Sequence, residues 1–276
     1  MEGIELVFFG TGGGRFATIT QKRRTGGIRL LSKKLNIHID PGPGALIYSL
    51  QAGLNPQKIK TLLVSHRHPD HCSNSEVLVE AMTRGMTRKR GIVAAPSSIL
   101  SGNGSTGPAI SKYHQNMINE AIILKPGVNF KIANAKIAST KTSHSDPDTV
   151  GFRLEIPEVG GIGYSADTEY FEGIAEQYKG VRLLILSVMR PTGSPWTGHM
   201  TPKDAAKVVE IVEPEMVVAT HFGMKMIFSG PTHEVKLIEK TTGVPTVAAF
   251  DGMKLRVNER ITFGKVNRKK QDIEDF

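Results

Sequence analysis

The chain has 276 residues, 39% of them hydrophobic and 22% charged, and its net charge at neutral pH is +9. These proportions are typical of globular proteins, and without an apolar run of about eighteen residues a membrane-spanning helix is not expected. The single cysteine, Cys72, excludes an intrachain disulfide, and nothing near Met1 resembles a secretion signal. We therefore expect a cytoplasmic protein with no membrane partner.

Short apolar strands alternate with segments of helical spacing along the whole chain, which predicts an α/β protein with antiparallel hairpins mixed into its sheets. In the first half, strands are predicted at residues 4–9, 27–31, 35–39, 61–65 and 92–95, and helices at 44–52 and 75–85. In the second half, strands are predicted at residues 128–133, 136–141, 150–156, 161–164, 183–188 and 216–220, and helices at 168–178, 201–212 and 233–241.

The two halves are not separated by a low-complexity linker. The Ser- and Gly-rich stretch at residues 97–108 is typical of a long loop rather than a domain boundary. We expect a single domain over residues 1–268, followed by a polar tail at 269–276 that frays in solution.

Residues 66–71 read His-Arg-His-Pro-Asp-His and directly follow the predicted strand at 61–65. Imidazole nitrogen and carboxylate oxygen are the ligands that borderline-soft divalent metals prefer. At the end of a strand, His66 and His68 can point to one side while Asp70 and His71 turn toward a neighbouring position. This short stretch can therefore contribute to two adjacent metal sites.

Further ligands must come from other strand ends, and four residues qualify: His144, Asp167, His199 and His221. Each has an alternative interpretation, because a histidine at a strand end is often a structural hydrogen-bonding residue. Asp167 is also suited to cap the helix predicted at 168–178. Of His199 and His221, either one can be the last ligand; His221 is favoured because it follows the apolar strand 216–220.

The order His66-x-His68-x-Asp70-His71, then His144, Asp167 and His221, resembles the metallo-β-lactamase superfamily over most of the chain. The resemblance implies a four-layer αββα sandwich, in which two mixed sheets are flanked by helices and the site lies at one edge. It implies two divalent metals, bridged by a hydroxide and held by these seven residues: His66, His68 and His144 at one metal, Asp70, His71 and His221 at the other, and Asp167 between them. Asp40, in Asp40-Pro41-Gly42, would orient a ligand without binding metal. Zinc is the expected metal, and manganese, iron or nickel are alternatives.

Two further motifs resemble the phosphodiesterase branch of this superfamily, which includes ribonuclease Z and a cyclic-phosphate phosphodiesterase. One is the Gly-rich turn at residues 10–15, which is equally compatible with a simple flexible turn. The other is Gly198-His199-Met200-Thr201-Pro202. The resemblance implies that His199 acts as general acid on the leaving oxygen, beside Asp70 and Asp167 in the catalytic centre.

The chain also departs from both of these relatives. The interval from His144 to Asp167 leaves no room for the arm with which bacterial ribonuclease Z grips transfer RNA. Cys72 alone cannot supply the cysteines of the structural zinc in the cyclic-phosphate phosphodiesterase. The substrate therefore stays open between a small phosphodiester and a nucleic acid.

Basic residues cluster in the sequence, and such clusters are either solvated surface or contacts for phosphate-rich ligands. The clusters are Lys22 to Arg24 with Arg29, Arg84 with Arg88 to Arg90, and Arg268 to Lys270. Arg15, Lys22, Arg23 and Arg24 are the candidates for contact with non-reacting phosphates of the substrate.

We therefore predict a metal-dependent hydrolase, a phosphodiesterase or nuclease-like enzyme acting on a phosphate-containing substrate. The alternatives are a thioester or lactone hydrolase resembling glyoxalase II, and a nucleic-acid-binding module whose metals are structural. A homodimer is possible, with the segment from Met82 to Met86 as a candidate contact, although methionines at helical spacing are commonly core residues.

Overall fold

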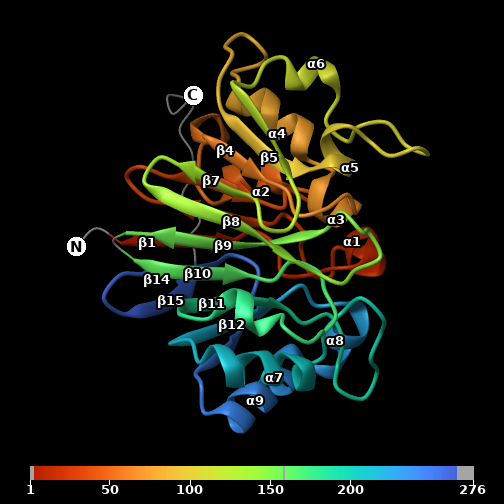
Figure 1. Cartoon of the computed structure of the whole chain (residues 1–276), viewed down its shortest axis with the longest axis vertical. Helices are drawn as coiled ribbons and strands as arrows, with labels where there is room; N and C mark the ends of the chain where they lie inside the picture. The colour runs from red at the N-terminus through yellow and green to blue at the C-terminus, as the bar shows by residue number, and fades with distance from the viewer. Residues whose placement is uncertain (1–2, 158, 266–276) are drawn as a thin grey trace.

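Two β-sheets lie face to face between two layers of helices in the computed structural model, which describes residues 3–157 and 159–265 (Figure 1). The first sheet has the order β15 (Ile261–Lys265), β14 (Met253–Val257), β1 (Ile4–Phe8), β2 (Ile28–Leu31), β3 (Asn36–Ile39), β4 (Thr61–Leu63), β5 (Ile92–Pro96) and β6 (Glu120–Leu124). The second has the order β13 (Thr246–Ala248), β12 (Met216–Thr220), β11 (Val181–Ser187), β10 (Gly160–Tyr164), β9 (Val150–Ile156), β8 (Ala135–Lys141) and β7 (Asn129–Ile132). The predicted αββα sandwich of two mixed sheets is confirmed.

The helices divide between the two outer layers and the connections at the sheet edge. From the first half of the chain come α1 (Arg15–Thr20), α2 (Ala45–Gln51), the 3₁₀ helix η1 (Pro56–Lys58), α3 (Pro69–Cys72), α4 (Ser75–Met82), α5 (Ser97–Leu100) and α6 (Lys112–Gln115). From the second half come the 3₁₀ helix η2 (Ala175–Tyr178), α7 (Pro202–Val212), α8 (Met224–Ser229) and α9 (Pro231–Thr242). Among the described residues, no helix combines the length and apolar character that crossing a bilayer requires.

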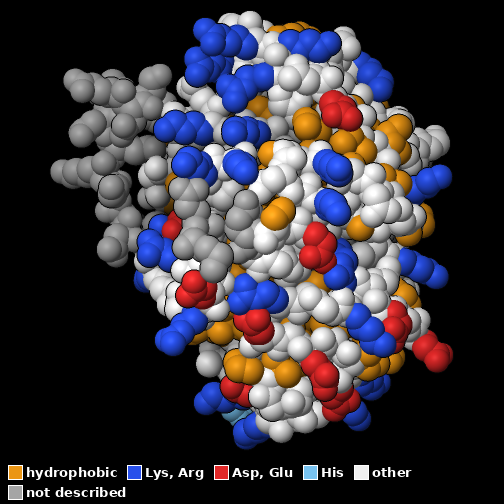
Figure 2. Space-filling view, turned by 60° about the vertical axis from the view of Figure 1, so that its left-hand side comes forward, with side chains coloured by type: hydrophobic (Ala, Val, Ile, Leu, Met, Phe, Trp, Pro, Cys, Tyr) orange, Lys and Arg blue, Asp and Glu red, His pale blue; other side chains and the backbone are white. Residues whose placement is uncertain are grey.

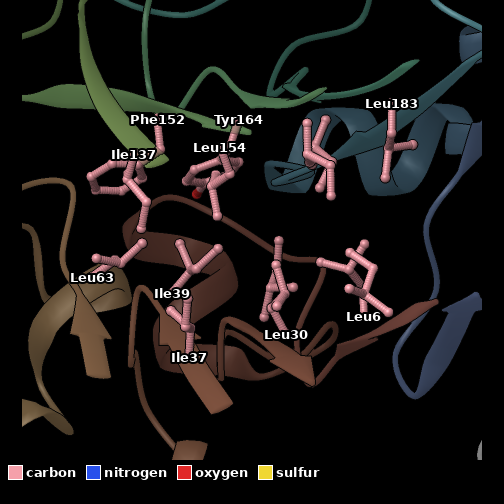
Figure 3. Packing of buried hydrophobic residues seen from close by; sticks show 14 of the residues in the cluster. Leu6, Leu30, Ile37, Ile39, Leu63, Ile137, Phe152, Leu154, Tyr164 and Leu183 are labelled. Atoms are coloured by element: carbon pink, nitrogen blue, oxygen red, sulfur yellow. The ribbon is translucent and has the colours of Figure 1, made fainter. Parts of the chain in front are cut away.

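Three apolar clusters hold the four layers together, one at each junction between layers. Between the sheets, side chains of β1 to β4 such as Leu6, Ile39 and Leu63 face Phe152 and Leu154 of the second sheet (Figure 3). The second cluster packs α7, α9 and η2 against the outer side of the second sheet, and the third packs α4 and α5 against the first. Since burial of apolar area is the main favourable term in folding, these clusters fix how the strand ends meet.

Parallel pairing in each sheet brings several strand ends to the same edge. Strands β3 to β6 are parallel neighbours, as are β10 to β13, whereas the remaining pairs are antiparallel. Polar residues that directly follow the parallel strands therefore gather where the sheets meet, the usual location of sites in open α/β sheets. In Figure 1 this edge carries α1, α3 and α8.

The helix predicted at 168–178 is wrong over most of its length, because only η2 at its end is helical. Thr168 Oγ1 accepts the Ser143 N–H, and the Glu169 carboxylate accepts from Ser143 Oγ and Gly198 N. These contacts hold the segment as a loop. Smaller differences are the helix α5 inside the predicted loop 97–108, and β6, β13, β14, β15, α1, α6 and α8, for which no element was predicted.

The single domain over residues 1–268 stays a prediction, although the core between the sheets takes residues from both ends of the described chain, such as Ile4 and Val257. The predicted tail, residues 269–276, lies outside the described residues. The helix predicted at 201–212 starts as its sequence indicates. Thr201 caps it in a capping box with Asp204.

A fully buried cation fastens α2 to the first sheet. The Arg29 guanidinium donates from Nε to His38 Nδ1 (3.1 Å), and from Nη2 to Ser49 Oγ on α2 (3.0 Å). His38 Nε2 donates to Gly26 O (2.9 Å), so Nδ1 is the acceptor. Burial lowers the pKa of Arg29 to about 9, which leaves it charged at neutral pH. Burial and the adjacent Arg29 lower the pKa of His38, which stays neutral.

We expect His38→Leu to be more destabilising than Arg29→Met, because it leaves the Nε donor of the buried guanidinium charge without its acceptor. Removing one partner of a buried charge, as in His38→Leu, costs about 3–5 kcal/mol. Removing the donor that a buried neutral acceptor uses, as in Arg29→Met, costs about 1–3 kcal/mol. Urea unfolding of both variants measures the two free energies. Equal losses, or the reverse order, would show that the Arg29 charge does not depend on His38.

Candidate metal centre

Strand β4 and the one-turn helix α3 bring the His-rich segment to the sheet edge. The chain leaves β4 through Ser65 and His66, and His68 occupies the N-cap position of α3, with Pro69 in the first turn. This turn places Asp70 and His71 in the interior, where both are buried. The thiol of Cys72, at the end of α3, donates to Arg67 O (3.1 Å), and burial raises its pKa to about 11. Cys72 is therefore a buried, protonated thiol.

Three imidazole nitrogens converge in the first cluster. Ser65 Oγ donates its proton to Asp40 and therefore accepts from His66 Nδ1 (3.0 Å), whereas His144 Nδ1 donates to Gly198 O (3.0 Å). The remaining nitrogens, His66 Nε2 and His144 Nε2, lie 2.9 and 3.1 Å from His68 Nδ1. One proton on His68 can satisfy only one of these contacts. Converging lone pairs are what a divalent cation requires.

A second cluster lies next to the first. His71 Nδ1 donates to Asp40 Oδ2 (2.9 Å), and His71 Nε2 lies 3.0 Å from His221 Nε2. His221 Nε2 is also 3.2 Å from Asp70 Oδ2. Asp70, His71 and His221 thus offer one carboxylate oxygen and two imidazole nitrogens within ligand distance of a shared point.

Asp167 lies between the two clusters. Its Oδ2 is 3.6 Å from His71 Nε2 and 3.9 Å from His144 Nε2, and its Oδ1 is 3.3 Å from His221 Nε2. Oδ1 is buried and has no hydrogen-bond partner, a costly state for a carboxylate oxygen unless a cation faces it. No helix begins directly after Asp167, because the next one, η2, begins at Ala175. The interpretation of Asp167 as a helix cap is therefore wrong.

Asp40 lies behind these ligands and contacts them from the first sheet. Its carboxylate accepts from Ser65 N (2.7 Å), Ser65 Oγ (2.8 Å), His71 Nδ1 (2.9 Å) and Tyr164 OH (2.7 Å). Burial and the neighbouring Asp40 raise the pKa of Tyr164, so its hydroxyl stays a donor. With four donors around it, Asp40 fixes the proton positions and ring orientations of its neighbours.

Left-handed backbone turns aim three of the site residues inward. Asp40 (φ 52°) and His221 (φ 60°) adopt this conformation themselves, and Ala166 (φ 51°) adopts it directly before Asp167. Residues with side chains pay about 1–3 kcal/mol for such geometry, which is typical of functional sites. Each turn comes within two residues of a strand end, at β3, β10 or β12.

The Gly-rich turn packs directly against the second cluster. A Cβ atom at Gly13 would overlap the His221 imidazole, so only glycine fits there. Gly13 N donates to Phe222 O (3.1 Å), and Gly14 N donates to Asp70 Oδ2 (2.7 Å). These contacts favour a structural role for the glycines in packing two candidate ligands, and they replace the interpretation of a simple flexible turn.

The electrostatics of the two clusters are those of a cation site. Burial opposes ionisation of Asp70, but His71 and His221 lower its pKa below the ordinary range. Burial likewise opposes protonation of His71, but Asp167, Asp70 and Asp40 raise its pKa above the ordinary value. The buried carboxylates thus face the positive charge of His71, which a divalent ion held here would replace with release of that proton.

His199 lines a cavity of about 450 Å³ that opens over both clusters. Its Nδ1 lies 3.8 Å from Asp167 Oδ2. Burial lowers the pKa of His199 to about 4, with His221 and His144 adding to the effect and Asp167 opposing it. Asp167, His199 and His221 also lie within ligand distance of one another, so the alternative in which His199 binds metal stays open.

The basic residues around the cavity differ from those proposed from the sequence. Of the four candidates, Arg15 lines the cavity, but Arg23 donates to Thr11 Oγ1 and Ala249 O (both 2.9 Å). Lys22 and Arg24 lie over the rings of Phe228 and Tyr48, outside the cavity lining. The cavity lining also includes three residues that no sequence motif indicated, Arg190, Trp196 and Lys225.

Much of the positive charge lies away from this cavity. Figure 2 turns the left-hand side of Figure 1 forward, and Lys and Arg gather on the upper half of that face. The helices α1, α3 and α8 around the site are on the right-hand side of Figure 1. The net positive charge of the whole chain therefore does not indicate which ligand the cavity binds.

Comparison with known proteins agrees with this geometry. The family model described as "Beta-lactamase superfamily domain" matches residues 35–222. An uncharacterized protein of Methanocaldococcus jannaschii is 38% identical over 256 residues, which are 92% of this chain and 95% of that protein. A ribonuclease Z of Kineococcus radiotolerans is 27% identical over 75% of this chain and 68% of its own length.

Among solved structures, the metallo-β-lactamase fold protein YhfI of Bacillus subtilis is similar with a TM-score of 0.77. The likeness covers 92% of this chain and 100% of YhfI at 18% sequence identity, so it bears on the fold alone. It agrees with the two facing sheets described above. The chain belongs to the metallo-β-lactamase superfamily.

Proposed function

We propose that the protein is a dinuclear metal-dependent phosphodiesterase. The observation that carries this proposal is the pair of converging ligand clusters with the unpartnered Asp167 oxygen between them and His199 in the same cavity. The relative named ribonuclease Z supports phosphodiester chemistry over other hydrolyses. Thioester hydrolysis and metal-dependent binding without turnover are the competing outcomes.

The proposed ligands follow from the geometry of the two clusters. His66, His68 and His144 would hold one ion, Asp70, His71 and His221 the other, and Asp167 both. The nitrogen-rich donor set suits zinc best, with manganese, iron or nickel as alternatives. Two divalent ions held there would supply an activated water and neutralise charge that develops at phosphorus.

The remaining chemistry falls to residues of this chain. Asp40 keeps the His71 proton on Nδ1, so that Nε2 is available as a ligand atom. His199 would hold the proton for the leaving oxygen. Burial lowers its pKa to about 4 in the metal-free protein, so an anionic phosphodiester must raise this pKa on binding before His199 can donate efficiently.

We expect His199→Ala to discriminate between leaving groups. Hydrolysis of 2′,3′-cyclic AMP, whose alkoxide must be protonated, should fall by about a hundredfold, since general acid catalysis contributes at least that much. Hydrolysis of bis(p-nitrophenyl) phosphate, whose leaving group needs no proton, should fall much less. His233→Ala, an exposed histidine on α9, is the matched control.

The metal content of the His199→Ala protein decides whether His199 is a general acid or a metal ligand. Unchanged metal with selective loss of the alkoxide reaction supports the general acid. Loss of bound metal would make His199 a ligand instead. Equal loss on both diesters, or turnover of thioesters but not of diesters in the wild type, would contradict the proposal.

We expect Gly13→Ala to weaken binding of the ion at Asp70, His71 and His221 by about 10- to 100-fold, because the added Cβ displaces the His221 ring. The ion at the other cluster should be retained. Metal titration followed by elemental analysis measures both affinities. Gly107→Ala, where an added Cβ meets open space, is the control, and a Gly13→Ala protein with both ions bound normally would contradict the role given to His221.

A further inference from the structure

We infer that the outer wall of the cavity is a subsite for an aromatic base that carries a phosphate, so that the substrate of the proposed phosphodiesterase is of the nucleotide class. The inference rests on the proposed function and adds the recognition that this function lacks. It is carried by one loop, residues 189–199, and by the adjoining helix α8.

This loop is fixed to one candidate ligand, His144, and to two neighbouring segments of the chain. Gly198 O accepts from His144 Nδ1, and Gly198 N donates to Glu169 Oε2 (2.8 Å). Arg190 N donates to the carbonyl of the fully buried Met200 (3.3 Å). Side chains on the loop are therefore held at a constant position relative to the candidate ligands, as recognition of a reacting group requires.

Two cations share one hydroxyl oxygen at the rim of the cavity. Ser194 Oγ accepts from Arg190 Nη2 (2.8 Å) and from Lys225 Nζ (3.0 Å). Among the described carboxylates, none forms an ion pair with either cation, and Glu234, which touches this loop, accepts the Thr192 N–H instead. Like charges brought this close repel each other, and an anion bound between them removes the repulsion.

An indole ring lines the same cavity beside these cations. The Arg190 guanidinium lies 5.5 Å from the Trp196 ring centroid, yet the Trp196 side chain is 62% exposed. Phe16 of α1, which also lines the cavity, is 71% exposed. Exposed aromatic rings that gather around one cavity mark a binding surface, and flat nucleobases stack on such rings.

The ligand must therefore carry a flat ring and a negative charge close together, and must also reach Asp167 and His199 in the same 450 Å³ cavity. A nucleotide-type diester meets all three requirements. Its base is the flat ring, a phosphate beside the base carries the negative charge, and the scissile phosphate reaches Asp167 and His199. A protein partner docking on the aromatic rim would use the rings but not the paired cations, and it is kept as an outcome of the test.

Trp196 is the single tryptophan of the chain, so intrinsic fluorescence reports on this subsite directly. The metal-loaded protein is titrated with AMP, and with ribose 5-phosphate as the matched ligand without a base. We expect saturable quenching by AMP and none by ribose 5-phosphate at the same concentrations. Replacing both cations (Arg190→Met with Lys225→Met) should weaken AMP binding about tenfold, since charge-assisted hydrogen bonds are lost. Lys240→Met, on α9, is the control.

The outcomes separate this inference from the proposed function, because diester hydrolysis is measured on the same preparations. Equal quenching by both ligands, or no AMP binding at millimolar concentration, overturns the subsite whatever the turnover. Quenching by AMP that survives loss of both cations overturns the phosphate part and favours a general aromatic docking surface. Quenching by AMP without diester turnover retains the subsite and overturns the phosphodiesterase.

Discussion

The buried carboxylate of Asp40 is the interaction on which the geometry of the site depends. It follows β3, and it accepts hydrogen bonds from the segment after β4, from α3 and from Tyr164 of the second sheet. A carboxylate buried between two sheets is stable only when its oxygens are fully used, and four donors achieve this. The same bonds that satisfy Asp40 set the tautomer of His71 and place Ser65 to receive the His66 proton.

The rest of the site follows from the positions of a few backbone turns relative to Asp40. Left-handed residues at strand ends direct Asp167 and His221 toward the α3 ligands, and Gly13 leaves the space that the His221 ring fills. Gly198 then connects His144 to the loop that carries Arg190, His199 and Trp196. The orientation of the candidate ligands, the position of His199 and the proposed base subsite thus depend on one another, because short contacts connect the segments that carry them.

The sequence was sufficient for most of the strands and for the cluster of candidate ligands at residues 66–71, because both have local signals. Buried strands such as β4 and β12 are continuous apolar runs, and the density of imidazole and carboxylate groups at residues 66–71 is typical of metal sites. Segment 168–178 has helical spacing, but the side-chain contacts of Glu169 with Ser143 and Gly198 outweighed it. Those partners lie 26 and 29 positions away and leave no local signal.

The residues that line the cavity beside the candidate ligands could not be predicted either, because contacts between distant parts of the chain bring them together. Arg190 and Lys225 meet only because Ser194 accepts from both, and Gly13 meets His221 from the opposite end of the chain. The basic cluster at Lys22 to Arg24 was the stronger local signal, but Arg23 is occupied by Thr11 and Ala249. Charge clustering in sequence identifies cations, and only the fold decides which of them share a cavity.

Anomalous diffraction from crystals of the zinc-loaded protein, recorded on both sides of the zinc absorption edge, can show whether the site holds two ions and which residues bind each of them. Two ions held as described give two anomalous peaks about 3.5–4 Å apart. One peak should lie among His66, His68 and His144, the other among Asp70, His71 and His221, with the Asp167 carboxylate contacting both. A single peak, or a second peak bound by His199 in place of His221, would contradict the account.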